Sequence, residues 1–197
     1  MIIAFYKPFG VLSQFTGDGS ANVPLAEFGF PRNIYPVGRL DADSEGLLLL
    51  SDEASVVKYL LEPQYAHPRE YWTQVEGIAT PDALKRLEMG VRVQNYDTKP
   101  CVARILSEED VQNLPERVPP IRVRKNIPTS WISLELTEGK NRQVRKMTAS
   151  VGLPTLRLVR VRIGAYQMPL FVPGQWRELG AEERTRVMVN ARDNESL

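Results

Sequence analysis

A run of four leucines behind a charged loop constrains the fold more than any other stretch of this chain. In "GRLDADSEGLLLL", residues 38–50, the leucines are typical of a short strand that is covered on both faces. Such a strand has no structural need of the charged residues Arg39, Asp41 and Asp43 at its entrance. The loop therefore either braces a turn or holds a carboxylate at the mouth of a cleft.

Periodicity along the rest of the chain predicts an α+β fold, with helices packed against a strand-rich sheet. Strands are expected over residues 2–8, 34–38, 46–51, 70–77, 101–106, 130–139 and 155–164. Helices are expected over residues 52–62, 81–90 and 141–152, with Ser51, Thr80 and Asn141 as their N-caps. The first helix is expected to bury its apolar residues Val56, Val57, Leu60 and Leu61.

Positive charge is concentrated in one segment of the chain. The net charge is +1 over 197 residues, but residues 118–164 contain ten Lys or Arg against two Glu, a balance of +8. In the strand over 155–164, the residues Arg157, Arg160 and Arg162 are expected to face solvent between apolar neighbours. The polar, proline-punctuated stretch over 108–129 is too long for an idle connector and predicts a loop that contacts a partner.

Two explanations of this basic segment remain open from charge alone. Its side chains could simply be solvated, or they could form a surface for a polyanion. Aromatic residues are sparse among these basic elements, with only Trp131 and Tyr166, which disfavours stacking on single-stranded bases. If the surface is functional, it therefore fits the phosphates of folded RNA or DNA.

Composition narrows the other classes of function. Cys101 and His67 are the only Cys and His, which leaves too few ligands for a zinc site of the usual type. No apolar run approaches the ~20 residues that cross a bilayer, and the N-terminus "MIIAFYKPFG" lacks the pattern of a signal peptide. A cytoplasmic protein without disulfides is expected.

Five motifs together resemble one family. "KPFGVLS", "GRLDADSEGLLLL", "EYWTQVEG", "EGKNRQVRKM" and "LVRVRIGAY…PGQWREL" occur in the order, from about residue 3 to 180, that is typical of the RsuA/RluB/RluE/RluF family of ribosomal RNA pseudouridine synthases. The stretch "PPIRVRKNIPTSW" and a start directly at the catalytic domain, with no S4 domain, are most similar to the RluE branch, which acts on large-subunit (23S) rRNA.

The resemblance implies a fold and a domain organisation. The pseudouridine synthase catalytic fold is a mixed, mostly antiparallel sheet with flanking helices and a central RNA-binding cleft. It would occupy residues 1–180 as one domain with two lobes around the cleft, and residues 181–197 would form a helical or flexible tail.

The resemblance also implies a reaction and its residues. In the isomerisation of uridine to pseudouridine the N1–C1′ bond breaks, the uracil turns, and C5 joins C1′, with no cofactor, metal or second substrate. Asp41 matches the catalytic aspartate, which either attacks C1′ or removes a proton. Arg145 matches its salt-bridge partner, Tyr71 matches the tyrosine against the flipped uracil, and Arg39 matches an arginine that enters the RNA stack.

The expected partner is ribosomal RNA, as a 23S stem-loop that is free or in an assembly intermediate, and the protein is expected to be a monomer. Cations expected on the RNA-binding surface are Arg124, Lys125, Lys140, Arg142 and Lys146. Two alternatives stay open. Asp41 and Asp43 could be the carboxylate pair of a nucleoside or glycoside hydrolase, or the chain could be a non-catalytic rRNA-binding or ribosome-assembly module.

Overall fold

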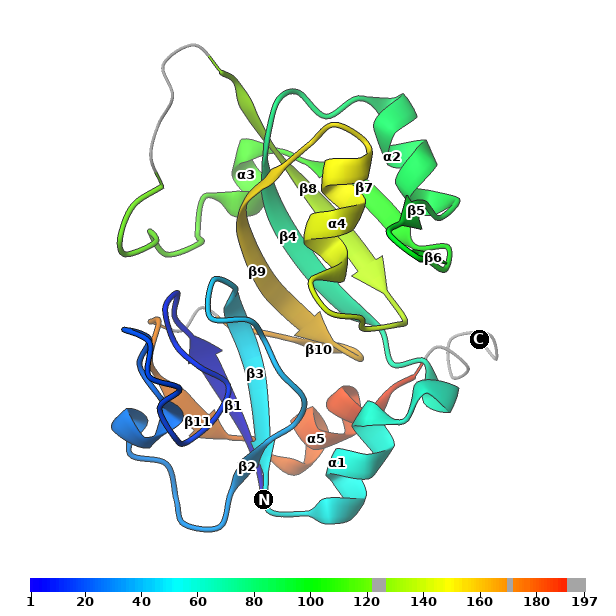
Figure 1. Ribbon diagram of the computed structural model, residues 1–197. Coiled ribbons are helices and arrows are strands. Elements are labelled where there is room, and N and C mark those ends of the chain that lie inside the picture. Colours follow the sequence, from blue (N-terminus) through cyan, green and yellow to red (C-terminus); the bar gives the residue numbers. More distant parts are fainter. Residues whose placement is uncertain (122–126, 170–171, 191–197) are drawn as a thin grey trace.

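The computed structural model of the chain describes residues 1–121, 127–169 and 172–190 (Figure 1). Its strands are β1 (Ile2–Lys7), β2 (Tyr35–Pro36), β3 (Glu45–Ser51), β4 (Arg69–Glu76), β5 (Arg92–Val93), β6 (Tyr96–Asp97), β7 (Val102–Leu106), β8 (Thr129–Leu136), β9 (Thr155–Ile163), β10 (Tyr166–Gln167) and β11 (Trp176–Glu178). Its α-helices are α1 (Ala54–Leu61), α2 (Pro81–Glu88), α3 (Glu108–Val111), α4 (Gln143–Ser150) and α5 (Ala181–Met188), with 3₁₀ turns at Leu25–Phe28 and Pro63–Tyr65.

One sheet runs through both halves of the molecule, in the order β11-β1-β3-β9-β4-β8-β7. Its registered pairs are antiparallel except at the junction of β3 and β9, which run parallel. Below this junction in Figure 1 lie α1 and α5 beside β1 and β3, and above it α2 and α4 lie against β4, β7 and β8. The mixed, mostly antiparallel sheet with flanking helices that was predicted is confirmed.

The leucine run forms the buried strand that the sequence indicates. All seven residues of β3 are buried. Leu47 and Leu49 face one hydrophobic cluster with α1 and α5, while Leu48 and Leu50 face a second cluster with β1 and the N-terminal loops. Because both faces of β3 are covered, its entrance is fixed on a rigid base.

The parallel junction of β3 and β9 depends on a glycine. Gly46 pairs with Arg160 and has a φ of +97°. A Cβ at this position would lie 2.3 Å from the carbonyl oxygen of Arg160, a contact that real Cβ atoms do not make. Only glycine tolerates both this backbone conformation and this approach.

Strand β9 corrects the expectation for its arginines. It lies in the middle of the sheet, between β3 and β4, so Arg157 and Arg160 are only 6% and 4% exposed instead of facing solvent. Arg157 forms a buried pair with Glu45, with two hydrogen bonds of 2.8 Å. Arg162 is half-buried and binds Glu70 and Glu135.

Helix starts were only partly predicted. Thr80 caps α2 by accepting a hydrogen bond from the backbone N–H of Ala83, as expected. The caps at Ser51 and Asn141 are wrong, because α1 and α4 begin later, after Glu53 and Arg142. The hydroxyl of Ser51 instead accepts from the N–H of Glu53 and donates to the carbonyl of Met1.

Two further features of the fold concern the chain's ends and surface. Leu61 is 43% exposed rather than buried like Val56 and Leu60 of α1, and it lines a pocket. Helix α5 lies in the expected tail and packs Val187 into the core with β1 and β3, whereas residues 191–197 lie outside the described residues. Among the helices described here, none combines the length and the apolar character needed to cross a membrane.

Candidate active site

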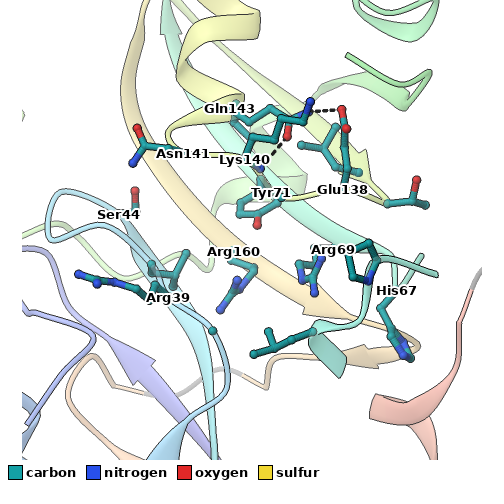
Figure 2. Close-up of a pocket in the computed structure, with 18 of the residues that line it drawn as sticks. Arg39, Ser44, His67, Arg69, Tyr71, Glu138, Lys140, Asn141, Gln143 and Arg160 are labelled. Carbon is teal, nitrogen blue, oxygen red and sulfur yellow. Dashed lines mark hydrogen bonds between the residues drawn. The ribbon is translucent and has the colours of Figure 1, made fainter. Parts of the chain in front are cut away.

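A pocket of about 830 Å³ opens where the two halves of the sheet meet. Its walls come from the loop over residues 37–44, the end of α1 and the loop over 136–144, and its floor comes from β4 and β9. Figure 2 shows side chains from these separate segments facing one space. Of the predicted site residues, Arg39, Asp41, Tyr71, Lys140 and Arg142 line this pocket.

The loop that carries Asp41 is held by hydrogen bonds on both sides. Ser13 donates its hydroxyl to the carbonyl of Leu40 at 2.7 Å and accepts from the N–H of Leu40 at 3.0 Å. The N–H of Gly10 donates to the carbonyl of Ala42 at 2.7 Å. The clamp by Ser13 reaches across 27 residues of sequence, and no motif in the sequence indicates it.

The carboxylates of this loop meet two arginines at the start of α4. Arg142 donates two hydrogen bonds to Asp43, at 3.1 and 2.8 Å, and its Nη1 lies 3.5 Å from Asp41. Arg145 donates to the backbone carbonyl of Asp43 at 2.7 Å and lies 3.5 Å from its carboxylate. The expected direct pair of Arg145 with Asp41 is therefore wrong, because Asp43 stands between them as the partner of Arg145.

Asp43 and Asp41 differ in their surroundings. Burial, the largest influence on Asp43, favours its neutral form, but the Arg142 hydrogen bond and the charges of Arg145 and Arg142 together lower the pKa of Asp43 below its usual range. Asp41 is exposed to nearly the same extent as Asp43, but its ion-pair distance to Arg142 is longer, at 3.5 Å, and Asp41 lines the pocket whereas Asp43 does not. Asp43 is thus the braced carboxylate of the pair, and Asp41 is the one available to a ligand.

Arg142 takes an unusual backbone conformation to reach this loop. Its φ is +53°, in the left-handed region that non-glycine residues rarely occupy. The residue directly precedes α4 and is followed by the buried Gln143, which accepts a hydrogen bond from the N–H of Lys140 at 3.0 Å. The local turn therefore directs the guanidinium of Arg142 across the cleft.

Lys7 is a buried cation behind the same loop. It is fully buried, and its Nζ donates to the carbonyls of Val11 at 2.7 Å and Pro8 at 3.1 Å. Burial lowers the pKa of Lys7 to about 7, although the negative charges of Glu45, Asp43 and Asp41 act in the opposite direction. Sequence reasoning gave Lys7 no chemical role.

Tyr71 lies on the floor of the pocket. It is half-buried in β4, directly opposite Arg160 of β9 and Leu134 of β8. Figure 2 shows its ring in the middle of the pocket, with Arg160 and Arg69 on the side to which its hydroxyl points. A planar ring held this way offers a face for stacking and a hydroxyl for a hydrogen bond.

The remaining predicted cations have different surroundings. The Nζ of Lys140 lies 3.7 Å from the centre of the Tyr96 ring, Lys146 is half-buried on α4, and Arg39 is exposed at the pocket rim. Arg124 and Lys125 lie outside the described residues. Within the described ranges, no three His, Cys, Asp or Glu side chains come together as a metal site would require.

Comparison with known proteins identifies the family. The family model for RNA pseudouridylate synthases matches residues 1–150. The ribosomal large subunit pseudouridine synthase E of Xanthomonas campestris pv. campestris is 49% identical over 90% of this chain and 94% of that protein. The protein of the same name from Vibrio parahaemolyticus is 42% identical over 90% and 73%, and the ribosomal large subunit pseudouridine synthase B of Bacillus subtilis is 34% identical over 92% and 69%.

The architecture agrees with this result. A solved crystal structure of a pseudouridylate synthase superimposes with a TM-score of 0.77, over 94% of this chain and 73% of the other, at 21% identity. That likeness concerns the fold, and the relatives of higher identity carry the assignment. The resemblance predicted from the five motifs is confirmed, and the chain belongs to the RNA pseudouridylate synthase family.

Proposed function

We propose that this protein converts a uridine of large-subunit ribosomal RNA to pseudouridine, with Asp41 as the carboxylate that acts on the ribose. The names of the relatives support the substrate class. The observation that carries the role of Asp41 is its position, since it is a carboxylate at the rim of a pocket large enough for a nucleotide, with Tyr71 on the floor.

The steps of the reaction can be assigned to residues of the pocket. Cleavage of the N1–C1′ bond leaves its electron pair on the uracil, and Asp41 either bonds to C1′ or removes the proton from C2′. The uracil turns and C5 bonds to C1′, as the Asp41–C1′ bond breaks on the first route or as the proton returns from Asp41 to C2′ on the second. C5 then loses its proton, and N1 gains one. Tyr71 supports the base while it is detached, because its ring lies on the floor of the pocket.

The ion pairs around Asp43 favour this reaction over hydrolysis by a carboxylate pair. A hydrolase needs one carboxyl group that is protonated at neutral pH and can act as a general acid. The pKa of Asp43 is lowered, with Arg142 and Arg145 both on its carboxylate. Asp43 is therefore poorly suited to donate a proton, and we assign it to positioning the loop.

The finer substrate follows from the same proposal. A uridine in a 23S rRNA stem-loop, free or in an assembly intermediate, must leave its stack to reach the pocket, at a cost of a few kcal/mol. Phosphate contacts by Lys140, Lys146, Arg124 and Lys125 would offset this cost, and Arg39 at the rim would occupy the vacated place in the stack. The enzyme would act as a cytoplasmic monomer, where ribosomes are made.

The test uses ribosomal RNA from cells that lack the gene. RNA carrying tritium at C5 of uridine is incubated with the protein, and release of tritium without free uracil is expected. Sequencing for pseudouridine then locates the modified position. Release of free uracil would indicate a hydrolase, and binding without tritium release would indicate a non-catalytic module. The Asp43→Asn variant serves as a matched control for Asp41→Asn.

A further inference from the structure

We propose that Arg69 and Arg160 form a phosphate subsite on the floor of the pocket, which binds a phosphodiester next to the target uridine. Both residues line the pocket on the side to which the hydroxyl of Tyr71 points (Figure 2). The inference rests on the proposed RNA substrate and adds to it a defined place for one phosphate of the bound strand.

Both guanidinium groups are fixed by the fold. In β4, Arg69 donates from Nη2 to the carbonyl of Leu60 at the end of α1, at 2.8 Å. In β9, Arg160 donates from Nε to the carbonyl of Leu47 in β3, at 2.8 Å. Because each contact uses one N–H of the fork, further donors remain on both side chains.

Arg160 has a donor that the fold leaves unused. The residue is 4% exposed, and its Nη2 is buried without a hydrogen-bond partner among the described residues. A buried donor of a charged group that lacks a partner costs free energy. A ligand that enters the pocket and accepts this hydrogen bond would recover that cost.

Within the part of the chain that the structure describes, neither cation is neutralised by a carboxylate. Neighbouring arginines are paired, as Arg157 is with Glu45 and Arg142 is with Asp43. For Arg69 and Arg160, no carboxylate of the described residues lies within the 4.0 Å of an ion pair. Burial lowers the pKa of Arg69; the nearby Tyr71 opposes this, and the charge of Arg160 adds to the lowering.

Placing two desolvated cations beside each other costs free energy, unless an anion binds between them. The anion that an RNA strand brings into this pocket is the phosphodiester, whose oxygens match the planar fork of arginine. Two cations at the rim are partly engaged elsewhere, since Arg142 is bound to Asp43 and Lys140 lies over Tyr96. The floor therefore adds positive charge that no carboxylate of the described residues pairs, on Arg69 and Arg160.

The first experiment measures affinity without conversion. Binding of 23S rRNA fragments is followed against salt for the wild type, Arg69→Gln and Arg160→Lys, with Arg86→Gln as control because Arg86 is exposed on α2 and outside the pocket. We expect Arg69→Gln to bind RNA about tenfold more weakly. The slope of its log binding constant against log salt concentration should fall by roughly the amount expected for one phosphate contact. Melting curves show whether each variant is folded, and Arg160→Lys keeps the charge in the buried position.

The second experiment identifies the phosphate. Once the target uridine is mapped, an uncharged methylphosphonate replaces the phosphodiester on its 5′ or its 3′ side. At one of the two positions the replacement should weaken binding to the wild type about tenfold and leave Arg69→Gln unaffected, because the contact is already lost. If the replacement weakens RNA binding by the wild type and by Arg69→Gln equally at both positions, the subsite does not exist.

Other outcomes are equally decisive. Unchanged affinity with a slower single-turnover cleavage in Arg69→Gln would mean that the guanidinium acts on the departing uracil, and it would overturn the phosphate subsite. If the wild type forms no pseudouridine in any rRNA, the proposed function fails, while the salt slopes still report on the subsite. The two proposals therefore fail independently.

Discussion

Arg142 and Asp43 are joined by two hydrogen bonds of 3.1 and 2.8 Å across the mouth of the cleft. One residue directly precedes α4 and the other belongs to the loop before β3, 99 positions apart in sequence. The same guanidinium lies 3.5 Å from Asp41. The position of the proposed catalytic carboxylate therefore depends on a contact between the two halves of the molecule.

Loss of the Arg142 side chain should affect the reaction more than stability. Both partners are more than a third exposed, at 43% and 36%, and such pairs contribute at most about 1 kcal/mol to folding. Arg142→Gln should therefore shift the melting temperature by only a few degrees and slow conversion about tenfold, because the Asp41 loop is less firmly held. Single-turnover rates at saturating protein measure this. A wild-type rate would show that the loop is positioned without Arg142.

Substitution of Asp41 should remove conversion and leave the fold intact. Asp41→Asn keeps the shape without the charge, and Asp41→Glu moves the charge by one methylene, where a misplacement of about 1 Å can cost ~100-fold. RNA affinity should stay the same or rise slightly, since a carboxylate near phosphates is lost. Tritium release and melting curves are measured together.

The matched control for that experiment is Asp43→Asn. It should retain substantial activity, because the two backbone-anchored hydrogen bonds of Ser13 to Leu40 still hold the loop. Appreciable pseudouridine formation by Asp41→Asn, or complete loss only in Asp43→Asn, would reverse the assignment of the two aspartates.

The sequence predicted features that depend on local patterns. Four leucines between turn residues predict a strand with both faces covered, and β3 is such a strand. Proline after threonine predicts the start of α2, and Thr80 caps it. The family motifs predicted a shared site for Asp41 and Tyr71, and both line one pocket.

The predictions that the structure contradicts share a physical cause, because each concerned a residue whose environment is set by non-local packing. Alternating arginines in 155–164 are compatible with a solvated face, but β9 lies between β3 and β4, and Glu45 neutralises Arg157 there. The partner of Arg145 was predicted wrongly because Asp43, 102 positions away in the sequence, binds Arg145 in place of Asp41. The environment of Arg69 is not readable from the sequence, since it depends on α1 and β9 together.

Tyr71 separates a chemical role from a packing role. Tyr71→Phe should preserve RNA affinity and the melting temperature, because the ring that packs against the hydrophobic core is kept. Its conversion rate should fall if the hydroxyl contacts the base. Tyr71→Ala should weaken both binding and conversion, since it removes the stacking face. The Phe variant at wild-type rate would restrict Tyr71 to stacking.

Lys7 should give the protein a pH-dependent stability that one substitution removes. Its pKa is lowered to about 7 in the folded chain, against about 10.4 for an unperturbed lysine. Between these values the unfolded chain holds the proton and the folded chain does not, so the Lys7 contribution to stability rises with pH across this window and is constant below it. The slope for one such group is at most about 1.4 kcal/mol per pH unit.

Urea unfolding at pH 7.5 and pH 9 compares the wild type with Lys7→Met. The difference in unfolding free energy between the two proteins should change by about 1–2 kcal/mol in favour of the wild type at the higher pH. Cys101, whose pKa burial raises to about 12, makes stability fall with pH in the same range, but this effect is common to both proteins and cancels. Lys85→Met lies on the exposed face of α2, and its unfolding free energy should change with pH in the same way as that of the wild type. If the unfolding free energy of Lys7→Met also changes with pH as in the wild type, Lys7 keeps its proton behind the Asp41 loop throughout this range.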